Sequence, residues 1–243
     1  MTNYMFEKAK ANCDGIVEWL EGIKASGCKG VVLGLSGGKD STVVAMLAKL
    51  VWGDNVHALI MPNHSNTDTG DAIVISNILE LNSCYHPISD IYDIFDNPGF
   101  GYSEKALSNV APRIRMTLLY VTAQDLGYRV IGTGNRSERY IGWCTKFGDM
   151  ACDFNPIAHL TCSEVIELGL YLADKFGLPS EFIQKPPADG ITGKTDEDNF
   201  GFTYKQLDTY LLEGSSGDPA IDEKIEQLHA AAKHKLVMPA TME

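Results

Sequence analysis

The sequence predicts an α/β fold, a mainly parallel sheet flanked by helices on both faces. Short apolar segments of strand length alternate with segments of helical periodicity through the first half of the chain. In addition, glycine-containing loops follow two of these strands, where parallel sheets bind their ligands. No internal repeat and no linker divides the sequence, so we expect a single domain over residues 1–243.

The elements of the first half follow from the apolar spacing. Helices are expected where apolar residues recur every three to four positions, and strands where short β-branched runs end in glycine or polar residues. Pro112 should break or kink the last helix of this half, because proline donates no backbone hydrogen bond. In order, we expect a helix over 3–26, a strand over 30–35, a helix over 40–51, a strand over 56–60, a polar loop over 62–68, a helix over 70–81, a strand over 83–88, a helix over 103–126 and a strand over 129–131 that ends in GTGN.

The second half has a different character. Helical spacing continues over 163–176, 204–212 and 220–235. Between the first two of these helices lie three prolines and the polar stretch DGITGKTDEDNFG, which is too long for a simple connector. We expect a mobile flap around 182–202 that becomes ordered when substrates bind and shields the reaction from water.

Composition and charge exclude several functional classes. The net charge of −12 makes nucleic acid an unfavourable partner, because an acidic protein repels the phosphate backbone. No apolar run approaches the ~18 residues of a membrane span, and the N-terminus has no secretory pattern. The six cysteines form no CxxC pair, which disfavours a zinc site or a redox dithiol. We therefore expect buried free thiols, a cytoplasmic location, no membrane partner and no nucleic-acid partner.

The loop after the first strand, SGGKDS over residues 36–41, carries the strongest chemical signal. It is neither a Walker A loop nor a GxGxxG fingerprint. Its glycine pair lets a ligand approach the main chain, and the amides that open the next helix suit a phosphate. Asp40 would repel that phosphate unless a divalent cation lies between them, so the loop predicts magnesium. The alternative is that Asp40 only caps the helix.

This loop resembles the pyrophosphate loop of the N-type ATP pyrophosphatases, which cleave ATP between its α- and β-phosphates. Within that group the chain is similar to the ammonia-dependent NAD synthetases. The strings that carry the resemblance span nearly the whole chain: RIRM (113–116), GTGNRSE (132–138), TKFGDMACDFNPI (145–157), KPPAD, TDEDNFG and the final HK (234–235). It implies an adenine nucleotide α-hydrolase-like fold and the amidation of deamido-NAD through an acyl-adenylate, with release of AMP, pyrophosphate and NAD.

The resemblance also implies roles for particular residues. Magnesium would bind Asp40 and Glu138. From the chemistry of the two steps, we expect catalysis to depend on Asp40, on Lys39 as a charge on the departing pyrophosphate, and on Asp149 in the FGD turn as acceptor of a proton from ammonium. The ATP site would consist of Gly34, Leu35, Ser36, Gly37, Gly38, Lys39, Asp40, Ser41, Thr133 and Pro187. Deamido-NAD would be bound by Arg113, Lys146, Asp153, His234 and Lys235. The family is homodimeric, so the last two residues are expected to act near the subunit interface, on the partner's site.

Two positions depart from the family pattern. Cys162 stands where the family has an ATP-binding lysine, and Pro187 stands where it has a serine or threonine. Lys39, Lys185 or Lys194 could supply the missing charge. The segment before Gly34 holds no glutamine-hydrolysing domain, so free ammonia or ammonia from a separate protein is the expected nitrogen source. The alternatives are a tRNA-thiolating ATP pyrophosphatase, disfavoured by the acidic charge, and a non-catalytic nucleotide-binding protein, disfavoured by the Asp40–Glu138 pair.

Overall fold

The centre of the computed structural model is a sheet of four parallel strands in the order β3-β2-β1-β4. The strands are β1 (Val31–Gly34), β2 (Val56–Ile60), β3 (Asn82–Tyr85) and β4 (Arg129–Val130). The chain moves outward from β1 to β3 and then returns to place β4 on the other side of β1. The strand order therefore reverses between β1 and β4, where open α/β sheets bind their ligands. The structure describes residues 2–64, 68–185, 195–239 and 241–242.

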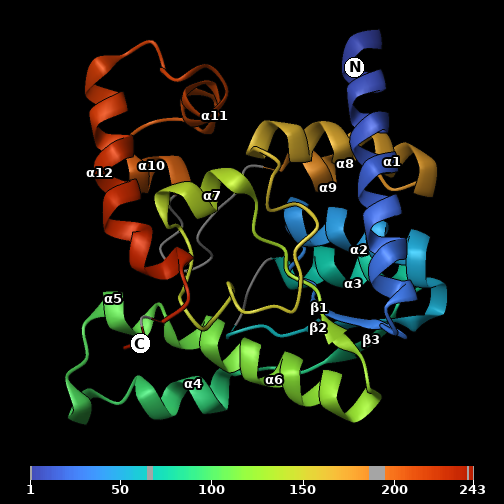
Figure 1. The fold of residues 1–243 in the computed structure, drawn as a ribbon. Helices are drawn as coiled ribbons and strands as arrows, with labels where there is room; N and C mark the ends of the chain where they lie inside the picture. Colours follow the sequence, from blue (N-terminus) through green and yellow to red (C-terminus); the bar gives the residue numbers. More distant parts are fainter. Residues whose placement is uncertain (1, 65–67, 186–194, 240, 243) are drawn as a thin grey trace.

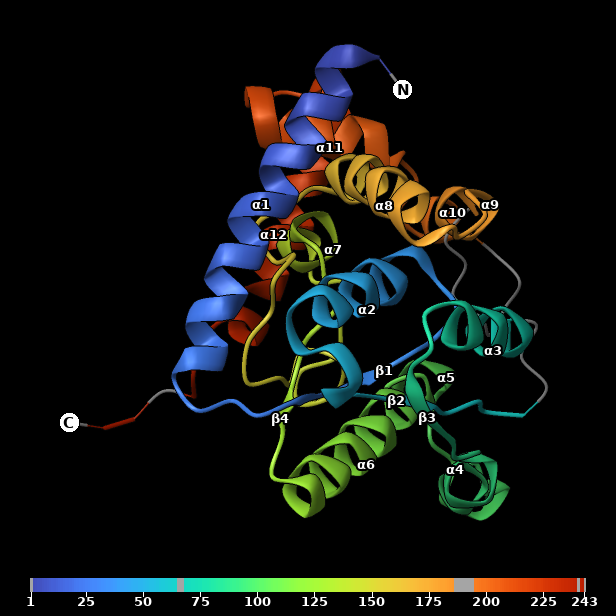
Figure 2. The ribbon, with the colours of Figure 1, turned by 90° about the vertical axis from the view of Figure 1, so that its right-hand side faces the viewer.

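Helices cover both faces of the sheet, as Figure 2 shows. One face is covered by α1 (Asn3–Ala25), α2 (Lys39–Trp52), α3 (Asp68–Ile78) and α8 (Cys162–Phe176). Leu20, Leu47 and Leu172 are fully buried in this layer. Burying an aliphatic side chain of this size contributes about 1.5–3 kcal/mol, so this layer is the main source of apolar stabilisation. The face opposite is covered by α4 (Ser89–Phe95) and α6 (Val110–Leu126), which α5 (Glu104–Leu107) precedes.

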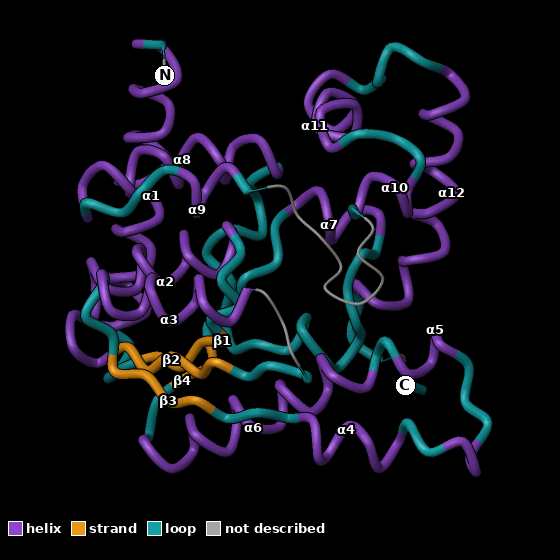
Figure 3. Tube along the Cα trace, turned by 180° about the vertical axis from the view of Figure 1, so that it is seen from behind, coloured by secondary structure: helices purple, strands orange, loops and turns teal. Residues whose placement is uncertain are grey.

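A third group of helices stands beside these layers rather than on the sheet (Figure 1). It consists of α7 (Arg136–Ile141), α10 (Asp196–Phe200), α11 (Tyr204–Glu213) and α12 (Pro219–Leu236). Its own apolar cluster includes Ile141, Phe200 and Leu207, all buried. Figure 3 shows this group and the sheet on different sides of the central loops. A further short helix, α9 (Glu181–Gln184), packs against α2 and α8, and two 3-10 turns are η1 (Gly53–Asn55) and η2 (Pro98–Phe100).

The predicted α/β class and its parallel sheet are confirmed, with differences at several ends. The helix expected over 70–81 ends at Ile78, because Glu80 takes a left-handed backbone conformation with φ +48°. The helix expected over 103–126 is broken near Pro112, as predicted: it is two helices, with the break at Ser108 and Asn109. The proline lies in the first turn of the second helix, where its missing N–H has no intrahelical partner to lose. The short helices α4 and α7 were not predicted.

The expected flap around 182–202 is described only at its ends. The helix α9 spans its beginning and α10 lies near its end, while residues 186–194, with Pro187 and Lys194, lie outside the described residues. Among the residues that are described, no helix is long and apolar enough to cross a membrane.

Candidate active site

The loop between β1 and α2 is held in shape by its own serines. The Ser36 and Ser41 hydroxyls lie 3.0 Å apart, and the Gly38 amide donates to Ser36 Oγ at 3.2 Å. Gly37 has a φ of +87°, a conformation that few residues other than glycine adopt easily. Gly38 caps α2 without a side chain, so the first amides of this helix have no side-chain capping partner. The loop therefore has the form of an anion site at a helix start.

Lys39 and Asp40 form a buried ion pair in the first turn of α2. Lys39 Nζ lies 2.7 Å from Asp40 Oδ2, and the lysine side chain is 3% exposed. Burial alone would lower the pKa of Lys39, but the nearby carboxylates of Asp40 and Glu138 outweigh it and raise that pKa. The lysine is therefore charged at neutral pH. Asp40 does not cap its helix, as the alternative interpretation would require, because its carboxylate points to side chains.

Asn135 joins the two predicted magnesium ligands. Its amide Nδ2 donates to Asp40 Oδ1 at 3.0 Å, and its Oδ1 accepts from the Glu138 backbone amide at 3.0 Å as the cap of α7. The loop after β1 and the loop after β4 therefore meet at the point where the strand order reverses. Burial, and then the charge of Asp40, hold the pKa of Glu138 well above its ordinary value. Two acidic groups that share one site are typical of a cation-binding position.

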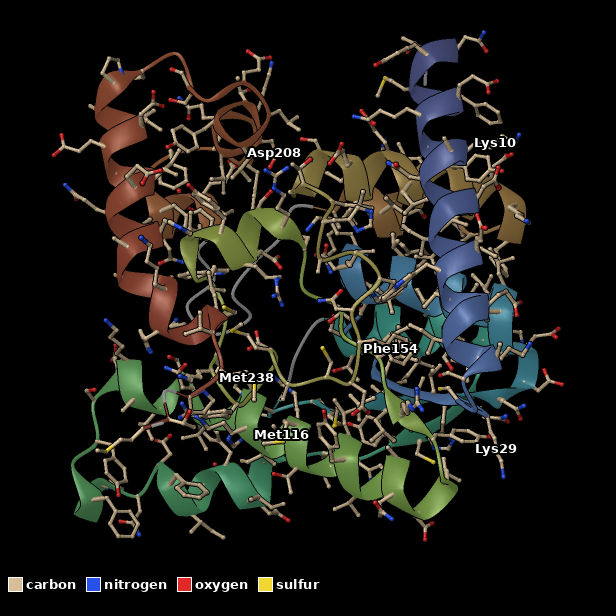
Figure 4. The ribbon with its side chains drawn as sticks, viewed as in Figure 1. Lys10, Lys29, Met116, Phe154, Asp208 and Met238 are labelled. Atoms are coloured by element: carbon tan, nitrogen blue, oxygen red, sulfur yellow. The ribbon has the colours of Figure 1, made fainter. Side chains whose placement is uncertain are left out.

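A cavity of about 430 Å³ opens at this junction. This volume falls within the range of about 300–1,000 Å³ for small-molecule sites. Its polar wall contains Ser36, Lys39, Asp40 and Glu138, with Thr133 from the loop after β4. Its apolar wall includes Leu59, Met61, Met116, Leu119 and Trp143. All of the predicted ATP-loop residues line the cavity except Gly37, and Pro187 lies outside the described residues. In Figure 4, Met116 is labelled on α6 below the central loops.

The third helical group supplies a further wall. Trp143 packs edge-on against Phe200 of α10, with 4.8 Å between ring centroids. Asp196, also on α10, lines the cavity and accepts from the Tyr204 hydroxyl at 2.9 Å. The Tyr204 ring lies under Lys39 Nζ, 5.7 Å from its centroid. The sequence suggested roles for neither Asp196 nor Tyr204, although TDEDNFG had been recognised as a family string.

Asp149 lines the cavity at the turn that follows α7, and Arg115 lies on the wall of α6. The Asp149 carboxylate accepts from the Thr145 amide at 2.6 Å. Burial raises the pKa of Asp149, and hydrogen bonds from the backbone oppose that rise only in part. Arg115 donates from Nε to the Met61 carbonyl at 3.0 Å, and burial lowers its pKa while Asp149 opposes the shift. Sequence reasoning missed Arg115, although it stands in the quoted RIRM string.

Four of the five predicted deamido-NAD residues lie together at one edge of the site. Arg113 Nη2 lies 3.4 Å from the Lys146 carbonyl, and Lys146 Nζ donates to the His234 carbonyl at 2.5 Å. Lys235 Nζ donates at 2.8 Å to the carbonyl of Gly142, the C-cap of α7, and to that of Cys144 in the loop that follows. This basic group connects α6, the loop after α7 and the end of α12. It has a concentrated positive charge in an otherwise acidic chain.

Asp153, the fifth, is not brought to this group and does not line the cavity. Its carboxylate accepts from the Val130 amide at 2.7 Å, and its own amide donates to the Val130 carbonyl. In this position Asp153 holds the chain against β4, which is a structural contact. Cys162 is 3% exposed, and burial raises the pKa of its thiol to about 12 despite the opposing charge of Lys39. It is therefore a neutral group beside the lysine.

The donors of the site suit magnesium in kind and number. Among the described residues, no three His, Cys, Asp or Glu side chains form a metal-binding group. Magnesium is commonly held by one or two carboxylates, with water and substrate phosphates completing six ligands. Asp40 and Glu138 fit that arrangement, because Asn135 contacts the carboxylate of the first and the backbone amide of the second beside the anion loop.

Comparisons with known proteins identify the family of the chain. The profile of the NAD synthase family matches residues 12–239. The NH(3)-dependent NAD(+) synthetase of Carboxydothermus hydrogenoformans is 40% identical over 92% of this chain and 93% of its own length. That of Finegoldia magna is 39% identical over 88% and 90%.

Two solved structures match nearly the whole chain. The NMN synthetase from Francisella tularensis has a TM-score of 0.88 and 35% identity, covering 96% of this chain and 98% of its own. The NH3-dependent NAD synthetase from Campylobacter jejuni has a TM-score of 0.75 and 34% identity, covering all of both chains.

Proposed function

The chain belongs to the NAD synthase family, and we propose that it is an ammonia-dependent NAD synthetase, a ligase that forms a C–N bond. It would convert deamido-NAD, ATP and ammonia into NAD, AMP and pyrophosphate. The observation that carries the proposal is the meeting of Asp40 and Glu138 through Asn135, beside an anion loop and a cavity. Neither relatives nor solved neighbours favour the tRNA-thiolating or non-catalytic alternatives.

The first step activates the acid. A nicotinate carboxylate oxygen attacks the α-phosphorus of ATP, an O–P bond forms, and the bond from that phosphorus to the β-phosphate oxygen breaks. Residues Gly34 to Ser41 would hold the phosphates with backbone amides and hydroxyls, Thr133 and Pro187 would add ATP contacts, and Lys39 would offset charge on the departing pyrophosphate. No covalent link to the protein is needed.

Magnesium, when bound, would act as a Lewis acid that stabilises negative charge on the phosphate oxygens. Asp40 and Glu138 would hold it. Asn135 would keep both residues in place, and Asp196 stands close enough on the cavity wall to add negative charge to the same region.

The second step forms the amide. Ammonia attacks the carbonyl carbon of the acyl-adenylate, a C–N bond forms, the bond between that carbon and the phosphate oxygen breaks to release AMP, and the nitrogen loses its extra proton to water. Ammonium must first lose a proton, and Asp149 would accept it. The raised pKa of Asp149 supports this role, because a carboxylate of ordinary acidity would be a weaker base.

Deamido-NAD carries a pyrophosphate and a carboxylate, which cations can recognise. We propose that Arg113, Lys146, His234 and Lys235 bind it, and their common location supports this. Asp153 remains a proposed contact through the family resemblance alone. Lys235 also donates hydrogen bonds to backbone carbonyls just after α7 in its own chain. A role on a partner's site would require those hydrogen bonds to break.

A homodimer and a cytoplasmic location complete the proposal. The surface formed by α4, η2 and α6 exposes a group of large apolar side chains: Ile91, Ile94, Phe95, Phe100 and Val121, each more than 40% exposed. Patches of this kind mark interaction surfaces, and a second copy of the chain is the expected occupant. All six cysteines are free thiols, which suits the reducing cytoplasm.

The deciding experiment incubates purified protein with ATP, magnesium, deamido-NAD and ammonium, and quantifies NAD, AMP and pyrophosphate. Equal formation of all three, each dependent on every substrate, is the expected result. Formation of AMP without NAD would instead indicate that another acceptor is adenylylated. Absence of AMP would contradict the proposal.

A second candidate substrate is the deamido mononucleotide, which lacks the AMP half of deamido-NAD. The observation that favours it is the TM-score of 0.88 with the Francisella NMN synthetase, against 0.75 with the Campylobacter NAD synthetase. The chemistry of the two steps would be the same. Measuring kcat/KM for both acids in parallel decides between them, and we expect the dinucleotide to be preferred.

A further inference from the structure

Lys39 occupies the place where a metal would have to bind. Its ammonium lies 2.7 Å from Asp40 Oδ2, and Asn135 holds the other carboxylate oxygen at 3.0 Å. Both oxygens of this proposed metal ligand are therefore engaged by the protein itself. Magnesium requires its oxygen ligands at about 2.0–2.1 Å, and a lysine ammonium cannot share such a position.

The surroundings of Lys39 explain why it is there. Asp40 on α2 pairs with its ammonium, the Tyr204 ring on α11 lies 5.7 Å from it, and Glu138 on α7 and Cys162 on α8 lie within electrostatic reach. Two of these groups are acidic, and Asp196 adds a third carboxylate through its hydrogen bond with Tyr204. Without a cation these buried acids would repel one another. Lys39 supplies that cation through its direct contact with Asp40.

The two occupants of Asp40 differ in how easily they can leave. Asn135 is fully buried, and its second bond caps α7, so moving it would disturb a helix. Lys39 reaches Asp40 through a flexible chain of four methylene groups. A triphosphate entering the cavity brings several negative charges that can pair with the ammonium. Lys39 can then pass from Asp40 to a phosphate oxygen and leave the carboxylate to a divalent ion.

We propose that Lys39 is the resident cation of the metal site, and that a divalent ion binds Asp40 only together with a nucleoside triphosphate. This inference deepens the proposed function and rests on its assignment of Asp40 and Glu138. It adds a role for the substrate-free protein: Lys39 excludes metal from the unloaded site and couples metal binding to nucleotide binding. Such coupling is reciprocal, so the metal strengthens nucleotide binding by the same factor.

The test measures Mn²⁺ binding to the nucleotide-free protein by electron paramagnetic resonance of the free ion. Wild type should bind weakly, and Lys39→Met should bind Mn²⁺ roughly tenfold more tightly or better, because the competing charge is gone. The matched control is Lys49→Met on the same helix, whose ammonium pairs with Asp54, 3.1 Å away, outside the cavity. It removes one positive charge from α2 and should leave Mn²⁺ affinity unchanged.

A double variant locates the gained affinity. Adding Asp40→Asn to Lys39→Met should return Mn²⁺ binding to the weak level of wild type. If Lys39→Met does not fold, as judged by circular dichroism, Lys39→Gln replaces it, since the amide can still donate to Asp40 without a charge. Lys39→Gln should also raise the affinity for Mn²⁺, but by less than Lys39→Met.

Three results would overturn the inference: no increase in Mn²⁺ affinity in either neutral variant, an equal increase in Lys49→Met, or persistence of the gained site without Asp40. None of these measurements requires turnover. If the protein forms no NAD, the proposed function is refuted, but the Mn²⁺ binding measurement can still be interpreted. If wild type forms NAD normally and the variants show unchanged Mn²⁺ affinity, only the inference is refuted.

Discussion

At the scale of single residues, one buried amide determines how the acids of the site meet. Asn135 is 0% exposed and makes two different contacts, a cap bond to the Glu138 amide and a donor bond to Asp40. Aspartate has nearly the same shape and can keep the cap, but it cannot donate to Asp40. The two contacts can therefore be separated by substitution.

Asn135→Asp should lower the free energy of unfolding by about 1–3 kcal/mol, because Asp40 loses its donor and faces another carboxylate. Asn135→Ala loses the cap as well, which alone costs about 0.5–2 kcal/mol. Urea denaturation of the metal-free protein measures both. Asn135→Ser keeps an oxygen that can cap α7, so it is the control in which the cap remains. Equal stability of Asn135→Asp and wild type would show that the Asp40 contact contributes nothing.

Asp149 predicts a pH dependence. Burial raises its pKa, so the folded protein holds this proton more tightly than the unfolded chain, and stability falls as pH rises from the ordinary aspartate value to the raised one. As a base the residue must be deprotonated, so kcat should fall as pH drops through the raised pKa. We expect an acid limb above the ordinary range near 3.9. The profile is recorded at constant free ammonia.

Asp149→Asn is expected to lower kcat and to remove that acid limb. The AMP-forming step, followed with pyrophosphate release, should retain its rate, since the proposed proton transfer belongs to the second step. An unchanged acid limb in the variant would assign the titration to another group.

At the scale of elements, the sequence predicted well those with a clear apolar pattern and poorly the short helices that lack one. The strand expected over 56–60 has those bounds in the structure, and the helices over 163–176 and 220–235 are each confirmed to within one residue at either end. Their apolar spacing is sufficient because each buries a face in an apolar cluster, α8 in the main core and α12 in that of the third helical group. By contrast α4 turns Ile94 and Phe95 to solvent, so its sequence lacks the pattern of a buried face.

The site divides in the same way. Asp40, Glu138 and Thr133 were predicted from local strings, and the strand order then brings their loops to one cavity. Arg115 and Asn135 were missed as site residues because their importance depends on partners 54 and 95 residues away. Spacing along the chain carries no information about such contacts. Asp153 is the opposite case: it was predicted as a site residue because it lies in a recognised string, but its carboxylate contacts β4 instead of the site.

The loop after β4 depends on a close approach at Gly132. A Cβ there would lie 2.6 Å from Cys152 Sγ and 3.0 Å from Cys152 Cβ. Gly132→Ala should therefore destabilise the fold by about 1–3 kcal/mol, the usual cost of overpacking. Adding Cys152→Ala should recover part of this loss, since it removes the nearest atom. Thermal unfolding of both variants and of Cys152→Ala alone checks the coupling. If the effects of Gly132→Ala and Cys152→Ala on stability are simply additive, the predicted contact between the two side chains is contradicted.

At the scale of the whole molecule, the active cavity and the apolar α4–α6 surface share one helix. Arg115 and Met116 of α6 line the cavity, while Val121, farther along the same helix, is 62% exposed. A partner on this surface would stiffen a wall of the site. Association and catalysis are therefore expected to depend on each other.

Ile94→Asp, at a side chain 62% exposed on α4, should convert the expected dimer into a monomer. A charge in a desolvated interface is costly, whereas the same charge in water costs little. Light scattering coupled to size exclusion measures the mass. Ile73→Asp on α3, a comparably apolar exposed position outside this surface, should leave the mass unchanged. A monomeric wild type would show that the protein does not dimerise. A dimeric Ile94→Asp would show that the interface lies on another surface.

The packing of Trp143 has a practical consequence for solution work. The other two tryptophans do not line the cavity: Trp52 stacks on Phe154, and Trp19 packs edge-on against the same ring. Trp143 lines it and contacts Phe200 of α10. A change in emission on adding nucleotide would therefore originate from this one indole, and Trp143→Phe should abolish it. The intrinsic fluorescence of Trp143 can therefore report on binding at the place where the substrates are proposed to bind.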